Sequence, residues 1–153
     1  MKDARFTLVG APTRAMETVV NSVVSDPTVR DRVKLTGQVS MERSRLEIAS
    51  GDLFIFPSKH EGFPISVMEA MTAGLAFVGA PVGAIPDMID VPSGGTLIDG
   101  GDIDSYANEI ERLARNRDIV ASMGKHNREK ALAQYDYPKA ISHLCRAYEL
   151  AVR

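Results

Sequence analysis

Two glutamates, Glu61 and Glu69, have the residue type and spacing best suited to chemistry in this chain. They end the segment Glu-Gly-Phe-Pro-Ile-Ser-Val-Met-Glu, which predicts Glu61 in a loop and Glu69 one turn into a helix. The first turn of a helix carries unpaired N–H groups and a partial positive charge, and it therefore suits a phosphate. Carboxylates beside that turn suit hydroxyl groups. A ligand that offers both kinds of group is a sugar nucleotide.

Short β-rich runs alternate with helical patterns along the chain, and this order predicts βαβ units around a parallel sheet. We expect strands at residues 6–9, 33–35, 53–56, 77–79 and 95–98, and helices at 14–24, 40–49, 65–73, 84–89, 102–115 and 119–134. A final helix is expected to open at Asp136. Gly74 is placed to end the 65–73 helix in a left-handed turn, and Met16 is expected in the core. The predicted fold class is α/β, a doubly wound, Rossmann-like parallel sheet with C-terminal helices.

Composition is that of a soluble globular protein, because 44% of the 153 residues are apolar and 25% are charged. Eighteen basic and twenty acidic residues give a net charge of −2, which offers no electrostatic footprint for nucleic acid or an anionic membrane. No apolar run has the length of a membrane span, and residues 1–5 open no secretory signal. The single cysteine, Cys145, cannot form an internal disulfide, so we expect a packing role and a reducing cytoplasmic location.

Other phosphate and metal motifs do not occur in the sequence. Residues 9–12 lack the three glycines of a dinucleotide-binding turn, and no Gly-rich loop ends in Lys followed by Ser or Thr. The acidic pair at 102–104 follows two glycines and opens a helix, so capping accounts for it better than metal binding. The chain has three histidines, His60, His126 and His143, and their spacing is not that of metal ligands. The sequence therefore predicts no metal site.

Five motifs follow one another along the chain: a strand ending in Pro-Ser (52–58), a Glu-x7-Glu element (61–69), a Gly-Ala-Ile-Pro-Asp turn (83–87), a strand with an acidic helix cap (95–102) and an aromatic-Asp-aromatic triplet (135–137). In this order they resemble the nucleotide-sugar-binding C-terminal domain of the retaining group 1 glycosyltransferases, which have the GT-B fold. The resemblance covers nearly the whole chain, from about Arg5 onward. It implies a single donor-binding domain over residues 1–153, one half of a GT-B fold.

The resemblance also implies a function. The chain would bind a nucleotide-diphosphate sugar for retaining transfer to an unknown acceptor, with no metal and no resident cofactor. Glu61 would lie near the transferred sugar, where it orients a hydroxyl or stabilises a cationic transition state; a loop carboxylate in water is the alternative. Glu69 would accept hydrogen bonds from the ribose hydroxyls, and a solvated helix glutamate is the alternative.

The same resemblance assigns the remaining donor-binding residues. Gly62 and Phe63 are expected to bring the backbone close to the sugar, with packing beneath the loop as the alternative for Phe63. The N–H groups of Ile65 and Ser66 are expected to serve the phosphate. The base is expected to contact the backbone of the segment after the second strand, which consists of Gly37, Gln38 and Val39. The alternative is that this segment is a plain structural turn.

Two parts of the family pattern are missing from the sequence. The family's C-terminal domain begins one βα unit earlier, with a basic loop for the diphosphate, and an acceptor-binding N-terminal domain precedes it. We therefore expect a chain that needs that acceptor domain or a partner chain, binds its nucleotide weakly and is inactive alone. A non-catalytic nucleotide-sugar-binding or scaffold module that acts through a partner chain is the alternative. A sheet edge or apolar patch exposed by the missing unit makes a homo-oligomer a further expectation.

Overall fold

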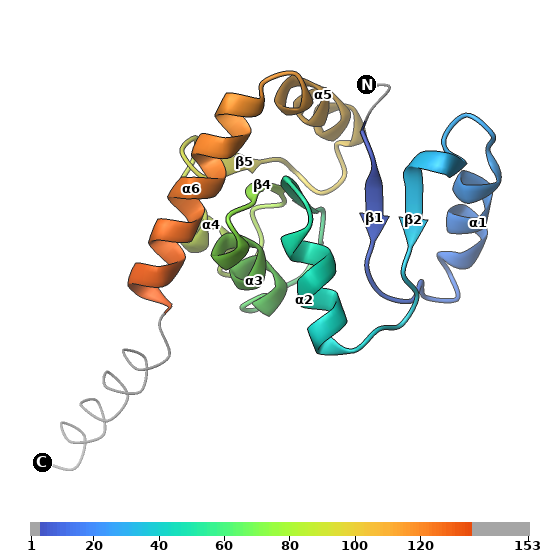
Figure 1. Ribbon diagram of the computed structural model, residues 1–153, viewed down its shortest axis with the longest axis horizontal. Coiled ribbons are helices and arrows are strands. Elements are labelled where there is room, and N and C mark those ends of the chain that lie inside the picture. Colours follow the sequence, from blue (N-terminus) through green and yellow to red (C-terminus); the bar gives the residue numbers. More distant parts are fainter. Residues whose placement is uncertain (1–3, 136–153) are drawn as a thin grey trace, which may run out of the picture. The chain divides into compact units, whose positions relative to one another are not determined.

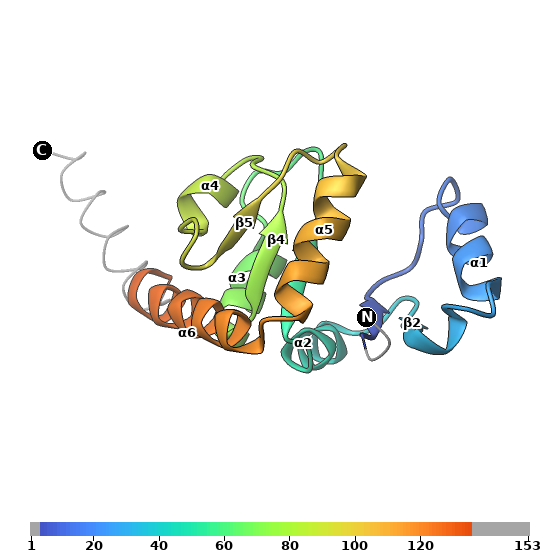
Figure 2. The same cartoon turned by 90° about the horizontal axis from the view of Figure 1, so that it is seen from above.

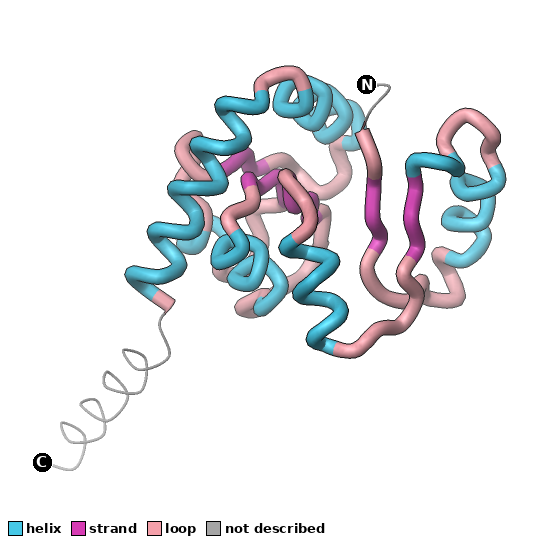
Figure 3. The backbone as a smooth tube through the Cα atoms, in the orientation of Figure 1, coloured by secondary structure: helices cyan, strands magenta, loops and turns pink. Residues whose placement is uncertain are grey.

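The computed structural model describes residues 4–135 and divides the chain into two compact units, the first ending at Gly51 and the second beginning at Asp52. In both units each strand is followed by a helix, as the tube in Figure 3 shows. The prediction of one domain over the whole chain stays a prediction. The helix expected from Asp136, with His143 and Cys145, lies outside the described residues.

The first unit is built on a two-stranded parallel sheet, drawn in blue in Figure 1. Its elements are β1 (Phe6–Leu8), α1 (Glu17–Ser25), the short 3₁₀ helix η1 (Arg30–Arg32), β2 (Val33–Leu35) and α2 (Met41–Ala49). Phe6 pairs with Val33 at one end of the ladder. Ser40 caps α2 as predicted, because its hydroxyl accepts a hydrogen bond from the Arg43 N–H at 3.2 Å.

Helix α1 departs from the sequence prediction, because it begins at Glu17 rather than at Arg14. Met16 was expected in the core but is 48% exposed, and Val20 is the buried member of the apolar stripe. Val23, on the same stripe, lines an apolar hollow of about 320 Å³ together with Phe6, Leu8 and Val33. The prediction for Met16 was wrong because two short strands offer too little apolar surface to cover the whole stripe.

An ion-pair cluster joins β2 to α2 in the first unit. Glu47, which is 8% exposed, accepts hydrogen bonds from Lys34 Nζ at 2.7 and 2.8 Å and pairs with Arg43 one turn earlier. The hydrogen bond from Lys34, helped by the one from Arg43, holds the pKa of Glu47 below its ordinary value. The carboxylate therefore stays charged and paired at neutral pH.

The second unit is a three-stranded parallel sheet with helices on both faces. Its elements are β3 (Leu53–Phe56), α3 (Ile65–Ala73), β4 (Ala76–Gly79), α4 (Ile85–Met88), β5 (Gly95–Leu97), α5 (Ile103–Ala114) and α6 (Arg117–Gln134). The strand order is β3-β4-β5, with Leu53 opposite Ala76 and Phe77 opposite Gly95. Figure 2 shows α3 and α5 on opposite sides of β4. These features confirm the predicted α/β class with a doubly wound parallel sheet.

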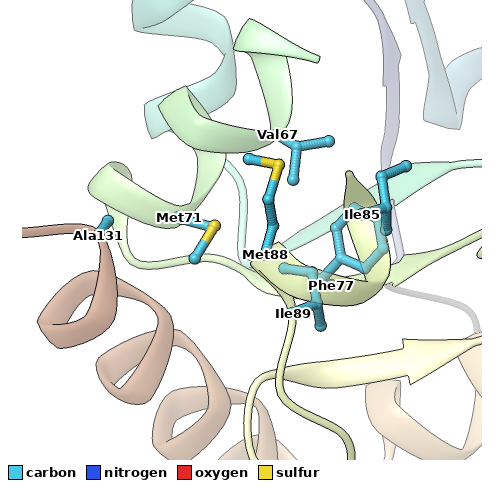
Figure 4. Close-up of a cluster of buried hydrophobic side chains, with 7 residues drawn as sticks. All are labelled: Val67, Met71, Phe77, Ile85, Met88, Ile89 and Ala131. Carbon is cyan, nitrogen blue, oxygen red and sulfur yellow. The ribbon is translucent and has the colours of Figure 1, made fainter. Parts of the chain in front are cut away.

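Strands β3 and β4 are apolar on both faces, because all their residues are apolar and successive side chains point to opposite sides. Leu53 and Ile55 pack on the cluster that α5 covers, whereas Phe54 and Phe56 pack on the cluster beneath α3 and α4. Figure 4 shows the buried members of the second of these clusters, Val67, Met71, Phe77, Ile85, Met88, Ile89 and Ala131. The loops at the carboxyl ends of β3 and β4 are therefore positioned by a sheet that is packed on both sides.

Polar contacts attach α6 to the rest of the second unit. Asn127 is fully buried, and its Nδ2 donates to the carbonyls of Leu75 at 2.9 Å and Gly94 at 2.7 Å. These two residues immediately precede β4 and β5. Arg128 donates to the Thr72 carbonyl at 2.6 Å, in the last turn of α3. Because a buried carbonyl without a partner costs about 1–3 kcal/mol, Asn127 is part of what holds the sheet together.

Candidate functional site

The loop at 57–64 follows β3 and carries the first candidate carboxylate. Glu61 is partly buried, and the hydroxyl of Ser58 donates a hydrogen bond to Glu61 Oε1 at 2.7 Å. Within residues 4–135 no hydrogen bond involves the other oxygen, Oε2. Lys59 and His60 are exposed. The loop thus orients one carboxylate oxygen and leaves the other available to a hydroxyl donor.

A turn after β4 contacts the backbone of this loop. Gly83 has a φ of +56°, and a Cβ at this position would lie 2.4 Å from the carbonyl oxygen of Glu61 and 2.5 Å from that of Gly62. The N–H of Ala84 donates to the Gly62 carbonyl at 2.9 Å. Glycine is the residue that adopts this φ and permits this approach without strain. The loops that follow the neighbouring strands β3 and β4 are therefore fixed against each other.

Helix α3 begins at Ile65, and its bounds, Ile65–Ala73, agree with the prediction. Gly74 ends it in the left-handed conformation, with a φ of +83°, as expected. The Val67 N–H donates to the Pro64 carbonyl at 3.1 Å, but in the described part of the chain the N–H groups of Ile65 and Ser66 donate to no acceptor. These two amides and the helix dipole give the start of α3 a partial positive charge that suits an anion.

Glu69 lies on the face of α3 that points away from the core. Ile65, one turn earlier, is 55% exposed and shares this face, and the opposite face is buried at Val67, Ala70 and Met71. Glu69 itself is partly buried. Ser66, three positions earlier, is a neighbour of Glu69 on the helix surface. One helix therefore carries both the amides and the second carboxylate.

Phe63 contacts Tyr135, which follows the last turn of α6. The two ring centroids are 5.8 Å apart with an interplanar angle of 71°, an edge-to-face arrangement. Phe63 is 48% exposed, whereas Tyr135 is partly buried and its burial raises its pKa. The ring of Phe63 therefore packs against α6, while much of its surface remains accessible.

The predicted base-contacting residues belong to the first unit, where they follow β2: Gly37, Gln38 and Val39. Gly37 has a φ of +64° and forms an antiparallel bridge with Gly10, whose N–H donates to the Thr36 hydroxyl at 3.0 Å. These contacts define a turn, and the base-binding role stays a prediction. The structure thus places the other candidates on one loop–helix segment: Glu61, Gly62, Phe63, Ile65, Ser66 and Glu69.

Three contacts of this segment were missed by the sequence analysis. The contact of the Ser58 hydroxyl could have been predicted locally, because a serine three residues before a loop glutamate can reach its carboxylate. Gly83 has a weaker signal, a glycine directly before the Ala-Ile-Pro start of a helix. Tyr135 has none that points to Phe63, because the two residues are far apart in sequence.

Neither a membrane-spanning helix nor a metal-binding cluster occurs within residues 4–135. No helix in that range is both long and apolar enough to cross a membrane. The same range holds no group of three His, Cys, Asp or Glu residues that could bind a metal ion. His126 instead forms a hydrogen bond between its Nε2 and Asp90 Oδ2 at 2.8 Å.

The family profile described as glycosyl transferases group 1 matches residues 1–116. The chain belongs to the group 1 glycosyltransferases. A relative, the sulfoquinovosyl transferase SQD2 of Arabidopsis thaliana, is 32% identical over 112 residues, which are 71% of this chain and 22% of that protein.

Two solved structures show that this chain has the fold of a GT-B domain. Sucrose-phosphate synthase from Thermosynechococcus elongatus matches with a TM-score of 0.83 and 22% identity, over 95% of this chain and 38% of that one. HepE of Anabaena in complex with UDP matches with a TM-score of 0.81 and 20% identity, over 95% of this chain and 41% of that one. The chain therefore spans less than half the length of each of these proteins.

Proposed function

We propose that this chain is the donor-binding part of a retaining glycosyltransferase and that it binds a nucleotide-diphosphate sugar. The observation that carries the proposal is the pair of unpaired amides at the start of α3, directly after the loop that orients Glu61. Membership of the group 1 glycosyltransferases supports it. The structure of HepE with UDP, which shares this fold, supports a nucleoside diphosphate as part of the ligand.

The amides of Ile65 and Ser66 act on the diphosphate in this proposal. Transfer breaks the bond between the anomeric carbon of the sugar and a phosphate oxygen, so negative charge grows on the leaving diphosphate. Fixed donors aimed at that charge stabilise the transition state, and removing one such donor costs on the order of 2.7–4 kcal/mol. Pro64 has no N–H and shapes the turn that exposes the two amides. Backbone amides in this role need no metal ion.

The two carboxylates act on opposite ends of the donor. Glu61, with one oxygen held by Ser58, faces the sugar, where it accepts a hydrogen bond from a hydroxyl or stabilises positive charge at the anomeric carbon. Glu69, on the exposed face of α3, accepts hydrogen bonds from the ribose hydroxyls. Gly62 and Phe63 bring their backbone towards the sugar. We expect binding, and no turnover, from the 153 residues alone.

Calorimetric titration of the whole chain with UDP, GDP, UDP-glucose and GDP-mannose tests this function. Glu69→Ala is expected to weaken binding of the preferred nucleoside diphosphate by about 1.5–3 kcal/mol, because a charged acceptor is removed from two hydroxyl donors. That loss corresponds to roughly 10- to 150-fold in Kd.

Glu129→Ala is the matched control, because Glu129 is also a helix glutamate of the second unit and lies 3.8 Å from Lys125 on the surface. It is expected to leave Kd unchanged. Equal affinities for wild type and Glu69→Ala would show that the ribose assignment is wrong. A wild-type chain that binds neither UDP nor GDP would refute the donor-binding function itself.

A further inference from the structure

Phe63 lies at a point of the 57–64 loop that backbone contacts leave unsupported. Before it, the Gly62 carbonyl is bonded to the Ala84 N–H, and after it the chain enters α3 at Ile65. Between these two points the ring of Phe63 makes its edge-to-face contact with Tyr135 at 5.8 Å. This contact is therefore placed to fix the end of the loop that leads into α3.

Tyr135 is itself fixed by its own helix. Its N–H donates to the Ala131 carbonyl at 2.9 Å, and its ring packs on the buried cluster to which Ala131 belongs. One turn earlier, Lys130 Nζ donates to the Asp87 carbonyl at 2.9 Å and to Asp90 Oδ1 at 2.7 Å. These bonds tie α6 to the last turn of α4 and to Asp90, two residues beyond its end. Tyr135 thus presents a rigid surface to the loop.

We propose that Tyr135 is a positioning residue: its ring holds Phe63, and through it the carboxylate of Glu61, in the orientation that the sugar half of the donor requires. The inference rests on the proposed function. Glu61 is two residues before Phe63, and the Ser58 hydroxyl that orients Glu61 belongs to the same loop. A loop released from Tyr135 can move Ser58 and Glu61 together.

The effect of Tyr135 is confined to the sugar half of the ligand. The amides at the start of α3 and the Glu69 side chain are positioned by the helix, which is packed on the core through Val67 and Met71. Tyr135 also packs on this cluster, so the substitution that tests its role is leucine, which keeps an apolar side chain against the core but removes the ring that contacts Phe63. Loss of the Tyr135 ring should therefore weaken recognition of the sugar and leave the affinity for the nucleoside diphosphate unchanged.

Amide hydrogen exchange measured by NMR tests the loop contact without any ligand. The Ala84 N–H reports on the loop, because it donates to the Gly62 carbonyl at 2.9 Å. An edge-to-face pair of ordinary strength implies that Tyr135→Leu speeds its exchange about 2- to 12-fold. Tyr135→Phe keeps the ring and should leave the rate unchanged. The internal control is the N–H of Leu75, which follows α3 and donates to the Ala70 carbonyl within it; its exchange rate should not change in either variant.

Calorimetry tests the consequence for the ligand, with UDP against UDP-glucose and GDP against GDP-mannose as probes. In wild type the sugar nucleotide is expected to bind more tightly than the diphosphate alone. Tyr135→Leu should bring the ratio of the two dissociation constants towards one, with the diphosphate's own Kd changed by less than 2-fold. Tyr135→Phe should restore the wild-type ratio.

The outcomes separate this inference from the proposed function. An unchanged Ala84 exchange rate or an unchanged ratio in Tyr135→Leu overturns the positioning role, while binding by wild type still supports donor binding. If Tyr135→Leu loses affinity for the diphosphate and also exchanges the Leu75 N–H faster, the substitution destabilises the protein generally, and this result also overturns the positioning role. A wild-type chain that binds none of the four probes refutes the proposed function, and the sugar-positioning role with it.

Discussion

Replacing Gly83 with alanine is expected to lower the free energy of unfolding by about 1.5–3.5 kcal/mol. The left-handed φ of +56° costs a residue with a Cβ about 1–2 kcal/mol. The new Cβ would lie 2.4 Å from the Glu61 carbonyl oxygen, so the loop must move and the bond from Ala84 N–H to the Gly62 carbonyl is lost, at about 0.5–1.5 kcal/mol. Urea unfolding followed by circular dichroism measures the sum.

Substitutions at two other glycines separate the cost of the left-handed backbone from the cost of the close contact with the Glu61 carbonyl. Gly37 also has a left-handed φ, of +64°, but a Cβ there meets nothing within 4 Å, so Gly37→Ala should show the backbone cost alone. Gly101 has no left-handed φ and the same open space, so Gly101→Ala should fall within about 0.5 kcal/mol of wild type. If Gly83→Ala costs no more than Gly37→Ala, the close approach of the two loops does not restrict residue 83, and the reasoning fails.

Two substitutions test the polar contacts of α6. Asp90→Asn should cost about 1 kcal/mol at pH 7 and less at pH 3. The hydrogen bond from Lys130, and then that from His126, lowers the folded-state pKa of Asp90 below 3.8, so its contribution is complete above that unfolded-state value and is lost as pH falls through the folded-state pKa. Urea titrations at both pH values measure this, and equal losses would contradict it. Asn127→Asp should cost at least about 2 kcal/mol at pH 7, because the carboxylate cannot donate to the two buried carbonyls; a smaller loss in the same assay would show that the amide is not needed.

The elements that the sequence predicts best are those with strong local signals at both ends. Helix α3 has Pro64 before it and Gly74 after it, and both of its bounds agree with the prediction. The continuous apolar run of β3 likewise predicts a strand packed on both faces. Helix α1 fails at Met16, because a periodic apolar stripe reports local structure but says nothing of the surface that must cover it.

Contacts within the candidate site were predictable only where the partners are close in sequence. The spacing of Glu61 and Glu69 places one in the loop and the other on α3, as expected. The contact of Gly83 with the Glu61 carbonyl joins two loops, and the contact of Phe63 with Tyr135 joins a loop to α6. Both depend on how β3, β4 and α6 pack, and no pattern in one segment encodes the identity of a distant partner.

The amide of Asn127 has a consequence for where this protein can be divided. The family profile ends at residue 116, before α6 begins. A shortened chain that stops there would lose the donor to the Leu75 carbonyl and one of the two donors to the Gly94 carbonyl, which also accepts from the Phe77 N–H at 3.1 Å. It would also uncover the buried clusters to which Met123 and Ala131 of α6 belong. We therefore expect the smallest piece of the second unit that folds to extend through α6, beyond the end of the profile match.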